Sequence, residues 1–186
     1  MCIRDSYDNA LTVALKLVEL DPNNSQFQRD LSVSYNKLGD IELRLGNTDA
    51  ALAHYDKDLT VALKLVELDP NNTQFQRDLS VSYNKLGDIE LRLGNTDAAL
   101  AHYDNALTVA LKLVELDPNN SQFQRDLIVS HVKMAELTKE QKNLSRTLSH
   151  YKEARRIVEN MASSGILAPD DEWIRGDLVT RISELE

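Results

Sequence analysis

Apolar residues recur at steps of three and four along most of the chain, which is the spacing of one face of an α-helix. Between residues 26 and 45 this stripe comprises Phe27, Leu31, Tyr35, Leu38, Ile41 and Leu45. A second stripe, over about residues 48–68, comprises Leu52, Tyr55, Leu59, Ala62, Val66 and Leu68. Each stripe predicts a helix of about 20 residues, or roughly 30 Å. The pattern therefore indicates an all-α protein.

Short polar segments separate the two stripes. Gly46 and Asn47 predict a left-handed stop to the first helix. The segment 69–72 (DPNN) predicts the end of the second, because proline disfavours helical geometry in the residue before it. Ser25 and Gln28 have the spacing of a capping box at the start of the first helix. The same pairing recurs as Thr73 with Gln76 and Ser121 with Gln124. Helices joined by such short turns are expected to pack antiparallel.

The whole pattern repeats every 48 residues. Residues 55–102 differ from residues 7–54 at only three positions, and residues 103–127 repeat residues 7–31 without a change. The three differences are Asn9/Lys57, Ala10/Asp58 and Ser25/Thr73. A period of this size predicts a solenoid, in which each unit packs mainly on its neighbours. Such an architecture offers an extended surface rather than a catalytic pocket.

The residues at fixed places in each repeat resemble those of the tetratricopeptide repeat family. The match lies in Tyr35, Leu38, Gly39, Gly46, Ala51, Tyr55, Leu59, Asp69 and Pro70. In that family, small residues let the two helices of a pair approach closely, and aromatic residues fill the gaps between them. The resemblance covers about residues 7–160. It implies a right-handed superhelical solenoid of antiparallel helix pairs.

The period is longer than that of the family, which is about 34 residues. The additional residues, about 14 per repeat, divide equally between the two helices and add about two turns to each. Lengthening both partners by a heptad keeps their apolar seams facing each other. The chain is therefore similar to the long-helix arrays of bacterial multidomain proteins.

The repeats suggest a division of the chain into an array, residues 7–162, and two flanking segments. Residues 1–6 do not match the repeat, and we interpret them as a foreign or artefactual leader. Residues 163–186 are expected to form a loop and a C-terminal capping helix. Within the array we expect an orphan helix at 7–21 and helix pairs at about 25–68, 73–116 and 121–162.

Asp58 breaks the repeat. The other copies carry alanine at this place, at Ala10, Ala106 and Ala154. We expect Asp58 to be buried, where a carboxylate without a partner is costly. His54, one helical turn earlier, is the expected partner. If the carboxylate is buried, Asp58→Ala should raise the melting temperature.

Composition narrows the classes of partner. A net charge of −9 argues against a general nucleic-acid binder, which needs a basic face. Cys2 is the only cysteine, so no internal disulfide is expected. The chain contains no apolar run of the roughly 18–20 residues needed to cross a membrane. Its first residues also contain no stretch typical of a signal peptide. A cytoplasmic protein without membrane association is expected.

No enzymatic or metal chemistry is predicted. His54, His102 and His150 recur at the period, but stacked repeats would hold them too far apart to share a zinc ion. The acid pairs Asp40/Glu42 and Asp56/Asp58 lie on helices with no glycine-rich loop and no partner nucleophile. We therefore expect neither a catalytic site nor a cofactor.

The resemblance implies a protein or peptide partner on the concave face of the array. Family ligands lie mostly against the first helix of each pair, on the side turned away from the second helix. Carried over to this chain, the candidate residues are Arg29, Val33, Asn36, Asp40, Leu43, Arg44, Arg77, Val81, Asn84, Asp88, Leu91 and Arg92. Arginine and asparagine there can bond a peptide, while valine and leucine take apolar side chains. Family members that clamp chaperone carboxylates carry asparagine at the place of Asp40, so an acid here argues against that ligand.

Three alternatives remain. Arg44 and Asp40 could pair four residues apart on a face that binds nothing, an interaction worth little. The orphan helix could instead be covered by a second chain, which would make the protein a self-assembling structural element. The array could also regulate an enzyme or signalling domain that is missing from this sequence.

Overall fold

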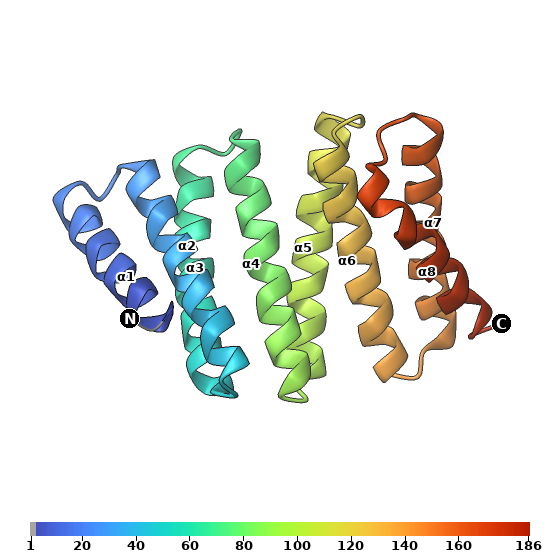
Figure 1. Ribbon diagram of the computed structural model, residues 1–186, viewed down its shortest axis with the longest axis horizontal. Helices are drawn as coiled ribbons and strands as arrows, with labels where there is room; N and C mark the ends of the chain where they lie inside the picture. The colour runs from blue at the N-terminus through green and yellow to red at the C-terminus, as the bar shows by residue number, and fades with distance from the viewer. Residues whose placement is uncertain (1–2) are drawn as a thin grey trace. The chain divides into compact units, whose positions relative to one another are not determined.

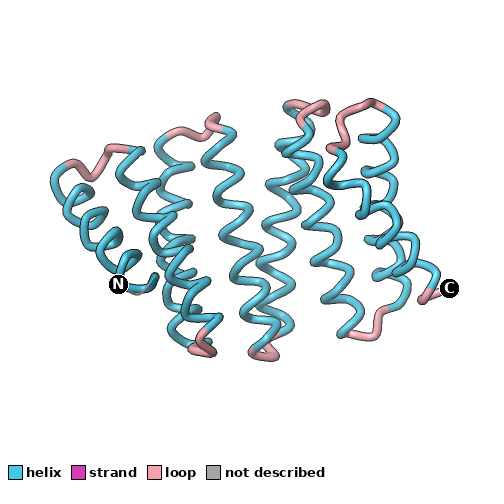
Figure 2. Tube along the Cα trace, in the orientation of Figure 1, coloured by secondary structure: helices cyan, strands magenta, loops and turns pink. Residues whose placement is uncertain are grey.

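Eight α-helices and one short 3-10 helix make up residues 3–186, the part of the chain that the computed structural model describes (Figures 1 and 2). The chain forms two units, Met1–Leu93 and Gly94–Glu186. In both units, successive helices pack against each other. The all-α class and the sequential antiparallel helix pairs predicted from the sequence are confirmed.

The first unit contains four helices, and each packs on the next along the chain. They are α1 (Ile3–Leu20), α2 (Ser25–Arg44), α3 (Thr48–Leu68) and α4 (Thr73–Arg92). The predicted stripes at 26–45 and about 48–68 correspond to α2 and α3. The orphan helix, predicted for residues 7–21, begins four residues earlier, at Ile3. Arg4 in this extension forms an ion pair of 2.9 Å with Glu42 of α2. Residues 1 and 2 of the predicted leader lie outside the described residues.

The second unit also consists of helices that pack in sequence. They are α5 (Thr96–Leu116), α6 (Ser121–Glu140), α7 (Leu144–Ser163), the 3-10 helix η1 (Pro169–Asp171) and α8 (Glu172–Ser183). Leu178 and Ile182 of α8 are buried in one cluster with Ile157 and Met161 of α7. The C-terminal helix thus packs on the apolar face of α7.

The close approach of α2 and α3 depends on a glycine and a tyrosine. Tyr55 is 1% exposed, and a Cβ added at Gly39 would lie 2.5 Å from its Cε1 atom. Leu86 and Ile89 of α4 join Tyr55 and Ala51 in the same cluster. Three residues that carry the family resemblance, Gly39, Ala51 and Tyr55, are therefore buried in the first unit.

The predicted capping boxes are wrong. The N-cap of α2 is Asn24, whose side-chain oxygen accepts the backbone N–H groups of Gln26 and Phe27 at 3.1 and 3.2 Å. Asn24 is extended, with φ −71° and ψ 107°, and its short amide reaches both donors at the open end of the helix. Ser25 is already the first helical residue, and Gln28 donates instead to the carbonyl oxygen of Pro22 at 2.7 Å. Asn72 and Asn120 cap α4 and α6 in the same way.

Left-handed residues end the first helix of each pair. Gly46 and Gly94 adopt φ values of +83° and +81°, which confirms the predicted stop at Gly46. Lys142 takes the equivalent place after α6 and keeps a positive φ of 56°. A side chain is disfavoured in this conformation, so the third copy retains the turn at some cost.

Candidate protein-binding groove

A pocket of about 280 Å³ lies in the first unit, where side chains of α2, α3 and α4 meet. Its lining residues are Ser32, Val33, Asn36 and Lys37 of α2, Asp58 of α3, and Arg77, Asp78, Val81 and Ser82 of α4. Four of them (Val33, Asn36, Arg77 and Val81) belong to the partner-binding face predicted from the sequence. The structure thus places residues 33 and 81, a full repeat apart, at one hollow.

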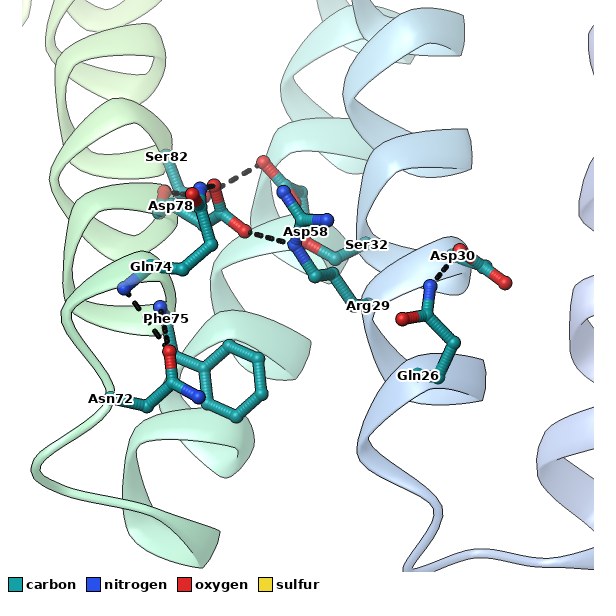
Figure 3. A network of polar contacts seen from close by, with 10 residues as sticks. All are labelled: Gln26, Arg29, Asp30, Ser32, Asp58, Asn72, Gln74, Phe75, Asp78 and Ser82. Atoms are coloured by element: carbon teal, nitrogen blue, oxygen red, sulfur yellow. Dashed lines mark hydrogen bonds and ion pairs between the residues drawn. The ribbon is translucent and has the colours of Figure 1, made fainter.

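Two ion pairs join α2 to α4 beside this pocket. Arg29 donates to Asp78 over 2.7 Å, and Lys85 lies 2.6 Å from Asp40 (Figure 3 shows the first pair). All four side chains are partly exposed, so each pair contributes less than about 1 kcal/mol. Both pairs connect the two helices that form the walls of the groove.

One alternative from the sequence paired Asp40 with Arg44, but Asp40 has other partners in the structure. Its carboxylate accepts bonds from the Tyr55 hydroxyl at 2.7 Å and from Lys85 at 2.6 Å. Partial burial disfavours the charged form, but these two bonds hold the pKa of Asp40 below its ordinary value. Burial and the bond to Asp40 raise the pKa of Tyr55. The alternative of an Arg44–Asp40 pair does not hold, because both partners of Asp40 come from neighbouring helices.

Asp58 lines the pocket and is buried, as predicted, with 1% of the residue exposed. Figure 3 draws it with Ser32 and Ser82. Its oxygens accept bonds from the Ser32 hydroxyl, from Asn36 Nδ2 at 3.0 Å and from the Ser82 hydroxyl at 2.9 Å. Burial outweighs these bonds and raises the pKa of the carboxyl. The predicted partner, His54, does not bond it. The donors that face Asp58 project from α2 and α4, whereas the His54 ring lies 6.1 Å from that of Tyr35.

The remaining candidate residues are distributed differently. Leu43 is partly buried against the core cluster around Tyr55 and Leu86, which limits its availability to a ligand. Asn84 has a buried side-chain oxygen without a hydrogen-bond partner. Arg44 and Arg92 are exposed at the ends of α2 and α4, while Asp88 and Leu91 are half-buried. None of these residues lines the pocket.

Five lining residues were not among the predicted site residues: Ser32, Lys37, Asp58, Asp78 and Ser82. The family face was inferred only from positions turned away from the second helix of each pair, so Asp58, the lining residue that α3 contributes, was missed. One signal was present in the sequence, because Asp58 is the only acid among four equivalent positions.

Two histidines of the second unit lie close together. In the second unit, His131 Nδ1 lies 3.1 Å from His150 Nδ1. Burial and the neighbouring His150 lower the pKa of His131 to about 4. Within residues 3–186, no three or more histidine, cysteine, aspartate or glutamate side chains are arranged to hold a metal ion. None of the described helices is long and apolar enough to cross a membrane.

Comparison with known proteins supports the fold. The chain is similar to the yeast histone chaperone Hif1, with a TM-score of 0.59 and 12% identity over 97% of this chain and 94% of that one. It is also similar to BtubC (BKLC) from P. vanneervenii, with a TM-score of 0.52 and 15% identity over 98% and 81% of the two chains. A search of curated protein sequences found no significant match.

Comparison of the sequence with models of known protein families also identifies helical repeats. Two models of the tetratricopeptide repeat match the chain, one at residues 33–62 and the other at residues 79–120. The first match covers parts of α2 and α3, including pocket residues Val33 and Asp58. The repeat matches and the shared fold agree: the chain contains tetratricopeptide repeats at residues 33–62 and 79–120 and has a fold like that of Hif1.

Proposed function

We propose that the chain is a protein-interaction scaffold that binds a peptide or an extended segment of a partner protein between α2 and α4. The pocket between these helices carries the proposal, since it joins Val33 and Val81 to hydrogen-bonding side chains such as Asn36. Apolar contacts flanked by a few polar groups are typical of ligand-binding pockets. The ion pairs between α2 and α4 connect the two walls of the pocket, and walls that are already packed together reduce the ordering cost of binding.

The similarity to known proteins is consistent with this role. Tetratricopeptide repeats match the pocket-forming helices, and Hif1, whose fold the chain shares, is described as a scaffold protein that recruits protein complexes to core histones. The helices α2 to α5 each have 20 or 21 residues. We assign the chain to a long-helix form of the repeat on the basis of these lengths and the 48-residue period.

The proposal is tested by selecting peptides from a random display library and measuring their affinity by fluorescence anisotropy. The groove variant is Val33→Glu/Val81→Glu. Leu63→Glu is the matched control, because it places the same charge at an exposed position of α3 that does not line the pocket. We expect the groove variant to lose at least about tenfold in affinity and the control less than about twofold. Equal binding by all three proteins, or no selected peptide, would contradict the proposal.

A second candidate function is self-association through α1. An open hollow of about 440 Å³ lies on α1 and α2, lined by residues that include Val13, Ala14 and Leu17. Val13 is 56% exposed, whereas Val61, the same residue one repeat later, is 9% exposed because α3 packs against both α2 and α4. Light scattering across a concentration series tests this candidate. Self-association that Val13→Glu abolishes would favour it over the groove.

A further inference from the structure

Asp58 gives the pocket a chemical feature that the repeat itself does not specify. The equivalent positions in the other copies are Ala10, Ala106 and Ala154, and nearly all other residues are identical between the first two repeats. The substitution places a carboxylate on the wall of the pocket between α2 and α4. A buried acid that breaks an otherwise consistent pattern is expected where function offsets a loss of stability.

The groups that donate hydrogen bonds to the carboxylate do not neutralise its charge. Its three donors, Ser32, Asn36 and Ser82, are all uncharged. Burial raises the pKa of Asp58, and the negative charge of Asp78 raises it further. Asp78 is in turn paired with Arg29. A cation that entered the pocket could therefore form a charge-assisted bond with Asp58 that none of its three present donors provides.

The rest of the pocket suits the apolar stem of such a cation. Val33 and Val81 line it from opposite helices, and long basic side chains commonly bury their methylene groups along apolar surface.

Two bases, Lys37 and Arg77, also line the pocket. Lys37 is exposed and acts on the pKa of Asp40 on its own helix. The pocket therefore combines an acid that is 1% exposed with bases nearer the surface.

We propose that this pocket accepts a lysine or arginine side chain of the bound peptide, with its charged group at Asp58 and its stem between Val33 and Val81. The inference rests on the proposed function of the groove and specifies the chemistry of the ligand. It separates this repeat from its neighbours, since alanine at the equivalent positions offers no acceptor for a cation. The single substitution would thus fix where along the groove the basic residue of a peptide binds, although the repeats are otherwise nearly the same.

Proton linkage follows from the same geometry. A cation binds the ionised carboxylate in preference to the protonated form, so its affinity should rise with pH through the raised pKa of Asp58. Asp58→Asn keeps the shape of the side chain but removes the charge. In that variant the affinity should be low and independent of pH over the same range.

The test uses n-butylammonium chloride as an analogue of the lysine side chain and n-pentanol as its neutral counterpart. Both are titrated into the isotope-labelled full chain, and NMR follows the carboxyl carbon of Asp58 and the amides of Ser32 and Ser82. We expect saturable shifts with n-butylammonium, no saturation with n-pentanol, and a loss of affinity of about tenfold or more in Asp58→Ala and Asp58→Asn. Asp58→Ala restores the residue of the other copies, so the variant is expected to fold.

Three results would overturn the inference: no saturation by n-butylammonium, equal binding of n-pentanol, or unchanged affinity in Asp58→Ala. These results are distinguishable from a failure of the proposed function. If selected peptides bind in a manner sensitive to Val33→Glu/Val81→Glu but n-butylammonium does not bind, the groove is retained and the cation pocket is rejected. If no peptide binds, the groove itself is rejected.

Discussion

Replacing Gly39 by alanine tests whether the contact between α2 and α3 sets the packing of the first unit. The added Cβ would lie 2.5, 2.7 and 2.9 Å from the Cε1, Cδ1 and Cζ atoms of Tyr55, where ordinary contact begins near 3.4 Å. The ring cannot easily retreat, because Tyr55 is buried and its hydroxyl is bonded to Asp40. Either the helices separate or the tyrosine leaves its position.

Two opposing effects decide the magnitude. Overpacking of this kind costs typically about 1–3 kcal/mol, and an overlap with three ring atoms places Gly39→Ala near the upper limit. Alanine recovers up to about 1 kcal/mol, because glycine is a poor helix former. We therefore expect a net loss of about 2 kcal/mol. For a chain of this length, that corresponds to a fall in melting temperature of roughly 4–8 °C.

The assay is urea unfolding followed by circular dichroism, with Gly176→Ala as the matched control. Gly176 also lies inside a helix, α8, but a Cβ added there meets no atom within 4 Å. This control should be stabilised by about 0.5–1 kcal/mol, since only the propensity effect remains. If Gly39→Ala is as stable as the parent or more stable, the close contact does not constrain the packing and the reasoning is refuted.

The third copy suggests how the cost could be relieved. It carries Ala135 at the place of Gly39, and the hydroxyl of the equivalent Tyr151 contacts Arg181 at 3.3 Å. An alanine is thus accommodated where the tyrosine has different partners. Asp40→Ala would release Tyr55, so the cost of Gly39→Ala should be smaller in that background. A double-mutant cycle measures this coupling.

Three further changes have signs that the structure determines. Asp58→Ala should raise the free energy of unfolding at pH 7, because burial raises the pKa of Asp58 and its ionised carboxylate destabilises the fold at any pH above the ordinary pKa of an aspartate. Thermal melts at pH 7 and 4 should show that this gain is smaller in acid. His131→Tyr should remove a loss of about 2 kcal/mol in the free energy of unfolding at pH 5, because the pKa of His131 is about 4 in the folded state, below the ordinary 6.5, and the parent loses stability as the pH falls through that interval. Urea unfolding at pH 7.5 and 5 checks this; if the substitution leaves the acid sensitivity unchanged, its cause lies with His150, Glu153 or Arg156. Lys142→Gly should raise stability by about 1 kcal/mol, because φ is 56° there, and a lower melting temperature would contradict this.

Local signals in the sequence were sufficient to locate the helices and their ends. The apolar stripes at 26–45 and 48–68 predicted α2 and α3 to within one residue, because a helical face and a stop such as Gly46 depend on residues only a few positions apart. The capping boxes failed at the same local level. The capping-box spacing pointed to Ser25, whereas the adjacent Asn24, which is also a good N-cap residue, is the one that caps α2.

The pairing of polar side chains depended on the tertiary structure. The sequence suggested His54 for Asp58 and Arg44 for Asp40, because residues four apart on a helix are neighbours. Asp58 instead accepts bonds from α2 and α4, and Asp40 pairs with Lys85, 45 positions along the chain. The repeat by itself determined that each helix buries one face against the next. Which donors then surround a given carboxylate depends on how close side chains from three helices come, a distance set by packing around residues such as Gly39 and Tyr55.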